Sequence, residues 1–169
     1  TGVYQAMEYL PGSNRVQAGD RVDAPISAAG KRVVIIGGGD TGADCLGTAH
    51  RQGAASVEQF EIMEQPPTHR TDAHPWPTWP FTYSTTSAHE EGGERTYAVS
   101  TKHFVADEDN VLTGLHFVEV RPRLVDGRMS FDEVPGSETE LPVDLVFLAM
   151  GFTGPRKAAC SPPGHGPTR

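Results

Sequence analysis

The chain has 169 residues, enough for one ordinary domain, and 37% of them are hydrophobic, so a buried core can form. The formal net charge of -8, with no run of Lys or Arg, argues against nucleic acid as a partner. The longest uncharged apolar run, 145–152, is far shorter than the roughly 20 residues of a membrane-spanning helix.

The cysteine content is low. Cys45 and Cys160 provide neither a disulfide framework nor a four-ligand metal or cluster site. The first residues also lack the basic start and apolar stretch of a secretory signal. We therefore expect no metal site and a reducing, cytoplasmic location.

The first predicted element is a short helix within Thr1–Leu10, where the apolar residues recur at helical spacing. Pro11-Gly12 is expected to end it. Residues 15–30 are polar and contain a Gly-Asp pair and a proline, which is typical of a connecting segment. A structural boundary is therefore expected near residue 31.

A strand, a helix and a second strand follow in close succession. Residues 32–36 form a β-branched run typical of a strand buried on both faces of a parallel sheet. Residues 40–51 show a helical pattern, and 57–63 form another short strand. The length matches one βαβ unit with its right-handed crossover.

The second half is predicted to be mainly strands. Several prolines and two tryptophans make 68–86 a long loop, because each proline removes a backbone donor. Alternating residues then predict three antiparallel strands, with turns at 109–110 and 126–127. An apolar strand at 143–150 returns to the centre of the sheet, and the tail from 157 is expected to be disordered. The predicted strands are 97–104, 111–120 and 124–131.

The chemistry-bearing motif is a G-x-G-x-x-G that follows the buried strand and opens the helix. It consists of Gly37, Gly38, Gly39, Asp40, Thr41 and Gly42. In this context the glycines allow a tight turn, close approach of a pyrophosphate, and close packing of helix on strand. The helix start offers free N–H groups, and Asp40 or Thr41 can cap it. The motif indicates dinucleotide binding; a Gly-rich turn of another α/β protein and a methyltransferase loop are the alternatives.

The choice of nucleotide stays open. Glu61 ends the second strand at the distance expected for a carboxylate that binds the adenosine ribose, which favours NADH. Arg51, His69 and Arg70 are cations available for a 2′-phosphate, which would favour NADPH. Each of these side chains has a plain alternative as a solvated surface group.

Three other features have less specific interpretations. His89-Glu90-Glu91-Gly92 is better read as a helix start or turn than as an acid/base or metal site, since adjacent side chains do not converge. Cys45 is a small buried residue without a redox partner. Trp76 and Trp79 are expected either to stack on a nicotinamide or a partner, or to cover an edge of the core.

Taken together, these stretches resemble the small (beta) subunit of glutamate synthase. The similarity runs from about Gly2 to about Pro155, which makes it far more specific than the glycine motif alone. The stretches that carry it are 6–11, 33–45, 59–63, Gln65-Pro66-Pro67, Trp76-Pro77-x-Trp79-Pro80, His89-Glu90-Glu91-Gly92, Thr101-Lys102-x-Phe104 and 144–152.

The resemblance implies an α/β fold, a Rossmann-like parallel sheet with an antiparallel three-stranded meander. It implies the pyridine-nucleotide domain of a flavoprotein with two dinucleotide-binding domains. Residues 1–30 would end an FAD-domain segment, 31–155 would bind NAD(P)H, and 156–169 would be a disordered or aberrant tail. By the same resemblance Gly39, Asp40 and Thr41 would hold the pyrophosphate. Ala149, Met150 and Gly151 would line the nicotinamide side.

The resemblance also implies the function of the complete subunit. A hydride passes from NAD(P)H to FAD, and electrons continue through iron-sulfur clusters to the large (alpha) subunit, which forms glutamate from 2-oxoglutarate and glutamine. This chain lacks the cysteine-rich segment, the first FAD motif and the C-terminal flavin region. We therefore expect a fragment that alone holds no FAD or cluster and does not turn over.

Two rival functions remain at this point. One is the nucleotide domain of another flavin-linked electron-transfer subunit, against which the Gln-Pro-Pro and Trp-Pro stretches argue. The other is a non-catalytic interaction module that keeps a Rossmann turn only as structure.

Overall fold

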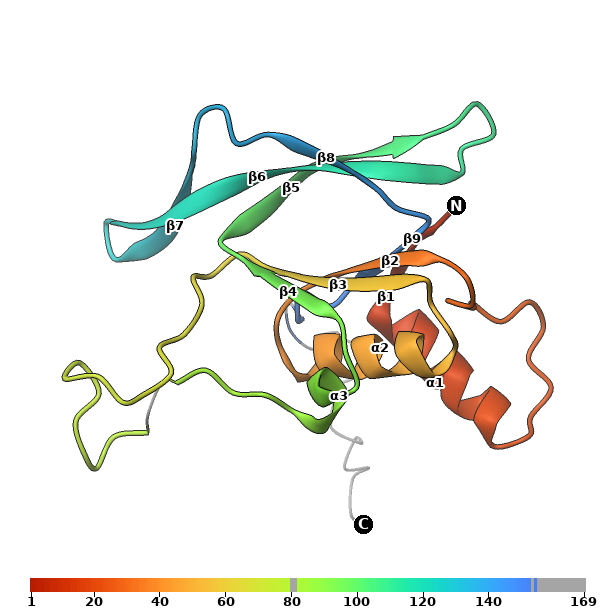
Figure 1. Cartoon of the computed structure of the whole chain (residues 1–169), viewed down its shortest axis with the longest axis horizontal. Helices are drawn as coiled ribbons and strands as arrows, with labels where there is room; N and C mark the ends of the chain where they lie inside the picture. Colours follow the sequence, from red (N-terminus) through yellow and green to blue (C-terminus); the bar gives the residue numbers. More distant parts are fainter. Residues whose placement is uncertain (80–81, 153, 155–169) are drawn as a thin grey trace, which may run out of the picture.

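The computed structural model describes residues 1–79, 82–152 and 154. Figure 1 shows three layers: an antiparallel sheet, a parallel sheet beneath it, and helices on the other side of the parallel sheet. The predicted α/β class is confirmed. The expected disordered tail lies outside the described residues.

The parallel sheet has the strand order β1-β9-β2-β3-β4, and every neighbouring pair in it is parallel. Its strands are β1 (Val3–Gln5), β9 (Leu145–Leu148), β2 (Arg32–Ile36), β3 (Ser56–Glu61) and β4 (Glu94–Tyr97). Helix α2 (Asp40–Arg51) connects β2 to β3. The predicted βαβ unit is confirmed, and so is the central position of the last strand.

The antiparallel sheet contains β5 (Val99–Ala106), β6 (Leu112–Val125), β7 (Arg128–Glu133) and β8 (Thr139–Pro142). The order β5-β6-β7 is the predicted meander, and its second turn has positive φ at Asp126 and Gly127, as a tight hairpin requires. Two details differ from prediction. Tyr97 ends β4 in the other sheet, and β8 adds a strand beside the first half of β6.

The predicted helix is present from Ala6 onward, but the prediction that it ends at Pro11 is wrong. Residues 3–5 form β1, because they pair with β9, a strand distant in sequence. Helix α1 (Ala6–Gln17) then continues through Pro11. A proline inside a helix removes one backbone hydrogen bond, and here the burial of Ala6 and Tyr9 in the core and the hydrogen bond from Gln52 to Ser13 offset that loss.

The core is divided by the parallel sheet into two clusters. On the helical side Val33 and Ile35 of β2 pack with α1 and α2, and the ring of Tyr9 stacks on Phe147 at 3.8 Å. On the other side Val34 packs with residues of the antiparallel sheet. Strand β2 is therefore buried on both faces, as its sequence predicts.

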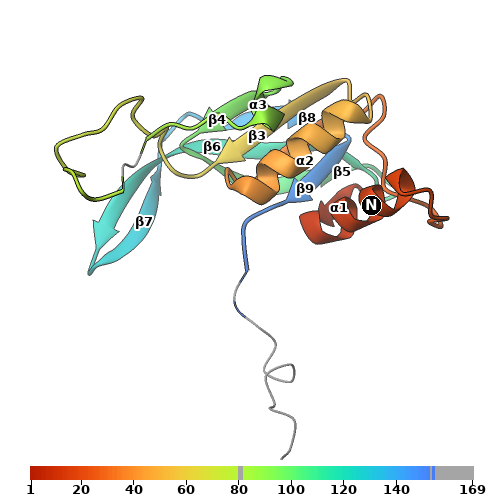
Figure 2. The same ribbon diagram turned by 90° about the horizontal axis from the view of Figure 1, so that it is seen from below.

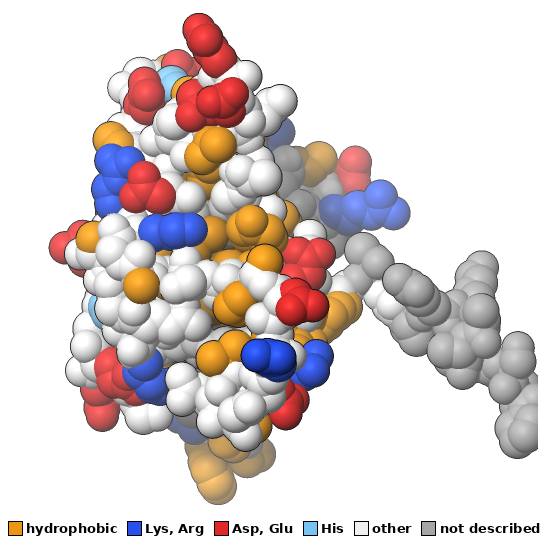
Figure 3. All heavy atoms as spheres, turned by 90° about the vertical axis from the view of Figure 1, so that its right-hand side faces the viewer, with side chains coloured by type: hydrophobic (Ala, Val, Ile, Leu, Met, Phe, Trp, Pro, Cys, Tyr) orange, Lys and Arg blue, Asp and Glu red, His pale blue; other side chains and the backbone are white. Residues whose placement is uncertain are grey.

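Residues 62–79 and 82–86, called the projecting segment below, extend away from these layers, toward the same side as the β6–β7 hairpin (Figures 1 and 2). This segment leads into α3 (Ser87–Glu90), so the prediction of a helix start around His89 is confirmed. Within the described ranges no helix has the length and apolar character to cross a membrane. On the face seen in Figure 3, acidic and basic groups are interspersed around hydrophobic ones, without a continuous basic surface.

Candidate functional site

The glycine turn between β2 and α2 is built around two close backbone approaches. Gly37 has φ +124°, and a Cβ there would lie 2.3 Å from the carbonyl oxygen of Ala149. A Cβ on Gly42 would lie 2.1 Å from the carbonyl oxygen of Gly37. The turn therefore admits no side chain at either position, which is why glycine occurs at both.

Helix α2 begins with its first N–H groups uncapped by any side chain. Gly39 occupies the cap position in an extended conformation, and the first helical bond runs from the Ala43 N–H to the Gly39 carbonyl. The prediction that Asp40 or Thr41 caps the helix is wrong, because both residues already lie inside its first turn. The free N–H groups and the positive end of the helix dipole therefore face whatever binds at the turn.

A cavity of about 1100 Å³ lies in front of this turn, at the carboxyl edge of the parallel sheet. Its walls come from the turn, the ends of β3 and β9, and the first part of β5. In open α/β sheets, ligands usually bind in a crevice at the carboxyl ends of the strands. The crevice forms between two neighbouring strands whose following connections run to opposite faces of the sheet.

Most predicted site residues gather around this cavity. The glycine turn contributes Gly37, Gly38, Gly39, Asp40 and Thr41; the far wall contributes Ala149, Met150 and Gly151, and Glu61 lies between them. Gly42 is buried beneath the turn. One cavity thus joins all three parts of the predicted dinucleotide site.

Two predicted cations are not brought to the site. Arg51 is the last of the twelve residues of α2, so it lies at the end of the helix opposite the turn, where it forms an ion pair with Glu91 at 2.6 Å. Arg70 is held within the projecting segment, where it donates to the carbonyls of His74 and Thr78 at 2.8 and 2.7 Å. Neither guanidinium lines the cavity, so the assignment of these two residues to a 2′-phosphate is corrected.

Glu61 is held in place by backbone donors. One of its oxygens accepts from the N–H of Gly38 at 2.8 Å and the other from the N–H of Met63 at 2.9 Å. Its carboxylate thus braces the glycine turn from the end of β3. It also borders a second cavity of about 330 Å³, whose walls include Arg95 of β4. Sequence analysis missed Arg95, because nothing in its local pattern distinguishes it from a surface cation.

A second brace comes from Gln59, a buried polar residue that sequence analysis did not identify. Its amide nitrogen donates to the carbonyl of Gly37 at 2.9 Å, and its amide oxygen contacts the Nε2 of His89 at 2.9 Å. Burial, together with the nearby Arg95, lowers the pKa of His89 below its ordinary value of 6.5. Four of the six residues of β3 are polar or charged, so nothing in the local sequence distinguishes Gln59 from its neighbours.

The wall from β5 was also missed. Among its residues Thr101 has a buried hydroxyl with no partner in the described structure. Lys102 pairs with Glu133, and the ring of His103 stacks on that of His116 at 4.3 Å.

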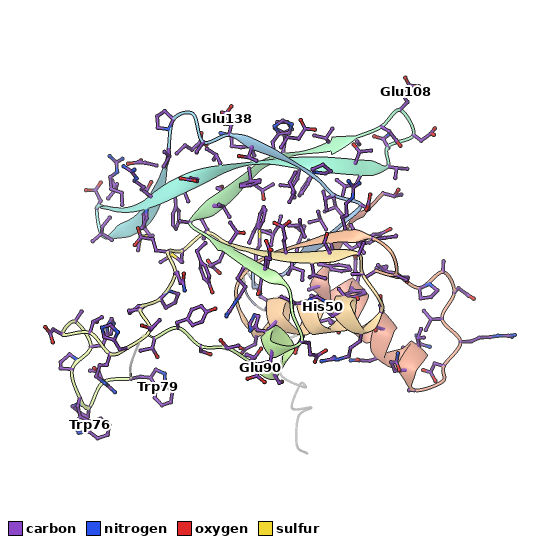
Figure 4. All side chains as sticks on the ribbon, in the orientation of Figure 1. His50, Trp76, Trp79, Glu90, Glu108 and Glu138 are labelled. Carbon is purple, nitrogen blue, oxygen red and sulfur yellow. The ribbon has the colours of Figure 1, made fainter. Side chains whose placement is uncertain are left out.

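The remaining candidates have structural explanations. Cys45 is fully buried, and burial raises the pKa of its thiol to about 12, so it is not a nucleophile at neutral pH. The side chains of Trp76 and Trp79 are 83% and 90% exposed at the end of the projecting segment (Figure 4), so they neither line the cavity nor cover the core. Within the described residues no group of His, Cys, Asp and Glu side chains is arranged to hold a metal ion.

Comparison with solved structures supports the fold alone. Thioredoxin reductase of T. acidophilum matches 89% of this chain and 40% of its own with a TM-score of 0.50 and 18% identity. FprA of Mycobacterium tuberculosis, solved with NADPH, matches 78% of this chain and 41% of its own with a TM-score of 0.52 and 12% identity. The predicted α/β fold, a Rossmann-like parallel sheet with an antiparallel meander, is therefore confirmed.

Sequence comparison is more specific. No family model matches the chain. The glutamate synthase [NADPH] small chain of Mycobacterium tuberculosis is 56% identical over 162 residues, which are 93% of this chain and 32% of that protein. The glutamate synthase [NADH] of Schizosaccharomyces pombe is 38% identical over 94% of this chain and 8% of its own length.

A third relative has a different name. The putative oxidoreductase UacF of Escherichia coli is 36% identical over 89% of this chain and 23% of its own length. The chain spans about a third of the length of the small chains that it matches. Over that shared segment, the chain is similar in sequence to glutamate synthase small chains.

Proposed function

We propose that this chain binds NAD(P)H across the larger cavity. The adenosine half would lie at Glu61, the pyrophosphate at the glycine turn and the start of α2, and the nicotinamide beside Ala149–Gly151. The observation that carries the proposal is that one cavity joins the turn, Glu61 and the end of β9. The free N–H groups at the start of α2 match the charge of a pyrophosphate.

In the complete subunit this site would serve electron transfer. The bound nicotinamide supplies a hydride for FAD, from which electrons would continue through iron-sulfur clusters to the large subunit for glutamate formation from 2-oxoglutarate and glutamine. The residues described here bind and orient the nucleotide, since the redox chemistry belongs to the cofactors. We place this activity in the cytoplasm, and we expect this chain alone to hold neither FAD nor cluster and to be inactive.

The proposal is tested by titrating the purified chain with NADH and NADPH in parallel, followed by calorimetry and thermal unfolding. A ligand that binds only the folded state raises the free energy of unfolding by about 2.7 kcal/mol at a hundredfold excess over Kd. S-adenosylmethionine is the control for the methyltransferase alternative. A cooperative unfolding transition that neither pyridine nucleotide moves would overturn the proposal and favour the interaction module.

A further inference from the structure

The strongest unassigned feature is the chain of hydrogen bonds that ends on the glycine turn. Gln59 is only 1% exposed, yet both polar atoms of its side chain have a partner. A buried amide is retained at such a position only where both hydrogen bonds form, because each unpaired group is costly.

The direction of these bonds is fixed by the first of them. The Gln59 nitrogen donates to the Gly37 carbonyl, so its oxygen must accept, and His89 must carry its hydrogen on Nε2. The other ring nitrogen of His89, Nδ1, then accepts from the backbone N–H of Thr86 at 3.2 Å and lies 2.9 Å from the Thr86 hydroxyl. This arrangement requires a neutral imidazole, since a proton on Nδ1 would face the Thr86 N–H.

The carbonyl at the end of this chain decides the shape of the turn. The Gly37 oxygen lies against the backbone of Gly42, where an added Cβ would be 2.1 Å from that oxygen and 2.5 Å from the Gln59 nitrogen. A rotation of the Gly37 peptide would therefore move the start of α2. The side chains of Gln59 and His89 do not line the larger cavity, so they act on a ligand there only through the turn.

We infer that Thr86, His89 and Gln59 form a positioning relay, which holds the Gly37 peptide in the orientation that a bound pyrophosphate needs and which functions only while His89 is neutral. This inference rests on the proposed function and concerns the same cavity. The relay ties the turn to α3, which begins directly after residues 82–86 of the projecting segment.

The surroundings of His89 determine how it responds to pH. Burial opposes protonation of the His89 ring and so lowers its pKa, and the positive charge of the nearby Arg95 lowers it further. Other titratable groups line the smaller cavity together with His89 or lie in the adjoining helices. The carboxylates among them would favour protonation of the His89 ring. The titratable groups are Asp40, Glu61, Glu64, Tyr83 and Tyr97 around the cavity, Glu90 and Glu91 in and after α3, and His50 and Arg51 in α2.

The first test compares two Gln→Leu variants of the whole chain. Gln59→Leu breaks the relay. Gln52→Leu is the matched control, because Gln52 also bonds a backbone group, the Ala28 N–H at 2.8 Å, but at the opposite end of α2. We expect NADH to bind Gln59→Leu about tenfold or more weakly, as the loss of a buried hydrogen-bond network predicts, and Gln52→Leu with unchanged Kd. An unchanged Kd in folded Gln59→Leu, or equal losses in both variants, would overturn the inference.

The second test needs no change at Gln59 and so covers the case in which that variant does not fold. ADP-ribose is titrated into the wild-type chain and into His89→Phe from about pH 7.5 to about pH 4.5, a window that extends well below 6.5 because the pKa of His89 is lowered. We expect the wild-type Kd to rise as the pH falls, and the variant to bind more weakly at neutral pH without that rise. A wild-type Kd that is independent of pH, or the same rise in both proteins, would overturn the relay. Absence of any nucleotide binding by the wild type would overturn the proposed function itself.

Discussion

The parallel sheet has an amino edge, where its strands begin, and a carboxyl edge, where they end, and the two differ in how their polar groups are paired. At the amino edge, Arg32 forms two side-chain hydrogen bonds with Asp144 at 2.9 and 2.6 Å, and Gln52 connects the end of α2 to Ala28 and Ser13. At the carboxyl edge, the start of α2 has no side-chain cap and faces the larger cavity. The closed edge stabilises the fold, whereas the open edge keeps backbone donors available for a ligand.

The largest expected effect is at the open edge, where Gly42→Ala would place a methyl group against the Gly37 carbonyl. Backbone has to move, at a cost of about 3 kcal/mol in the free energy of unfolding, and nucleotide binding is expected to be lost. Calorimetric titration with NADH and NADPH and thermal unfolding measure the two effects. Gly53→Ala is not a suitable control because Gly53 has φ +81°, whereas Gly12→Ala meets nothing within 4 Å and is expected to bind normally.

A smaller effect at the same edge is expected for Glu61→Gln. The substitution keeps the shape but removes the negative charge, and it replaces one of the two oxygens that accept from the Gly38 and Met63 N–H groups by an NH2 donor. We expect NADH to bind about tenfold more weakly, and NADPH to lose less, because the same change removes a repulsion toward a 2′-phosphate. The ratio of the two dissociation constants is the measurement. Equal losses for both nucleotides would show that Glu61 acts on the turn rather than on the ribose.

The prediction for the closed edge concerns how the stability of the fold depends on pH. The Arg32 guanidinium beside Asp144 lowers the pKa of that carboxyl from 3.8 to about 2. A lowered folded-state pKa gives stability that is fully present above pH 3.8 and is lost as the pH falls toward about 2. We expect Asp144→Asn to be less stable than the wild type at neutral pH, and the difference in Tm to shrink over that window. Nucleotide affinity at neutral pH should not change.

The smallest effect is expected for Arg51→Gln, also at the closed edge. Its side chain is 61% exposed in the pair with Glu91, and exposed pairs contribute about 0.5 kcal/mol or less. Thermal unfolding should therefore barely change, and NADPH should bind as before. A clear loss of NADPH affinity but not of NADH affinity would restore this residue as a 2′-phosphate ligand and contradict the separation of the two edges.

The local pattern of the sequence was sufficient for the centre of the fold. The β-branched run of β2, the glycine motif and the helical spacing of α2 are short-range signals, and the structure has each of them where predicted. Turn chemistry likewise located the hairpin at Asp126-Gly127. The failure at the start of the chain has the opposite cause, because β1 exists only through its pairing with the distant β9.

The candidate site likewise has one part that could be predicted from the sequence and another that could not. The glycine turn follows from the sequence, because a Cβ at Gly37 or Gly42 would lie about 2 Å from a carbonyl oxygen and only glycine fits. The position of Glu61 follows from its spacing after the motif. Gln59, His89 and Arg95 come together from three separate elements, so no local spacing indicates their contact. Arg51 and Arg70 show the converse error, since suitable charge and nearby sequence position did not bring either guanidinium to the cavity.

The sequence by itself determined the α/β class, the dinucleotide motif and the family resemblance, because these depend on residue types at short, fixed spacings. Only the tertiary structure decided which edge of the sheet is open, which side chains brace the turn and which cations remain outside the site. Those features depend on contacts between residues far apart in the chain, and their geometry is set by the packing of the two sheets and the helices rather than by any local pattern.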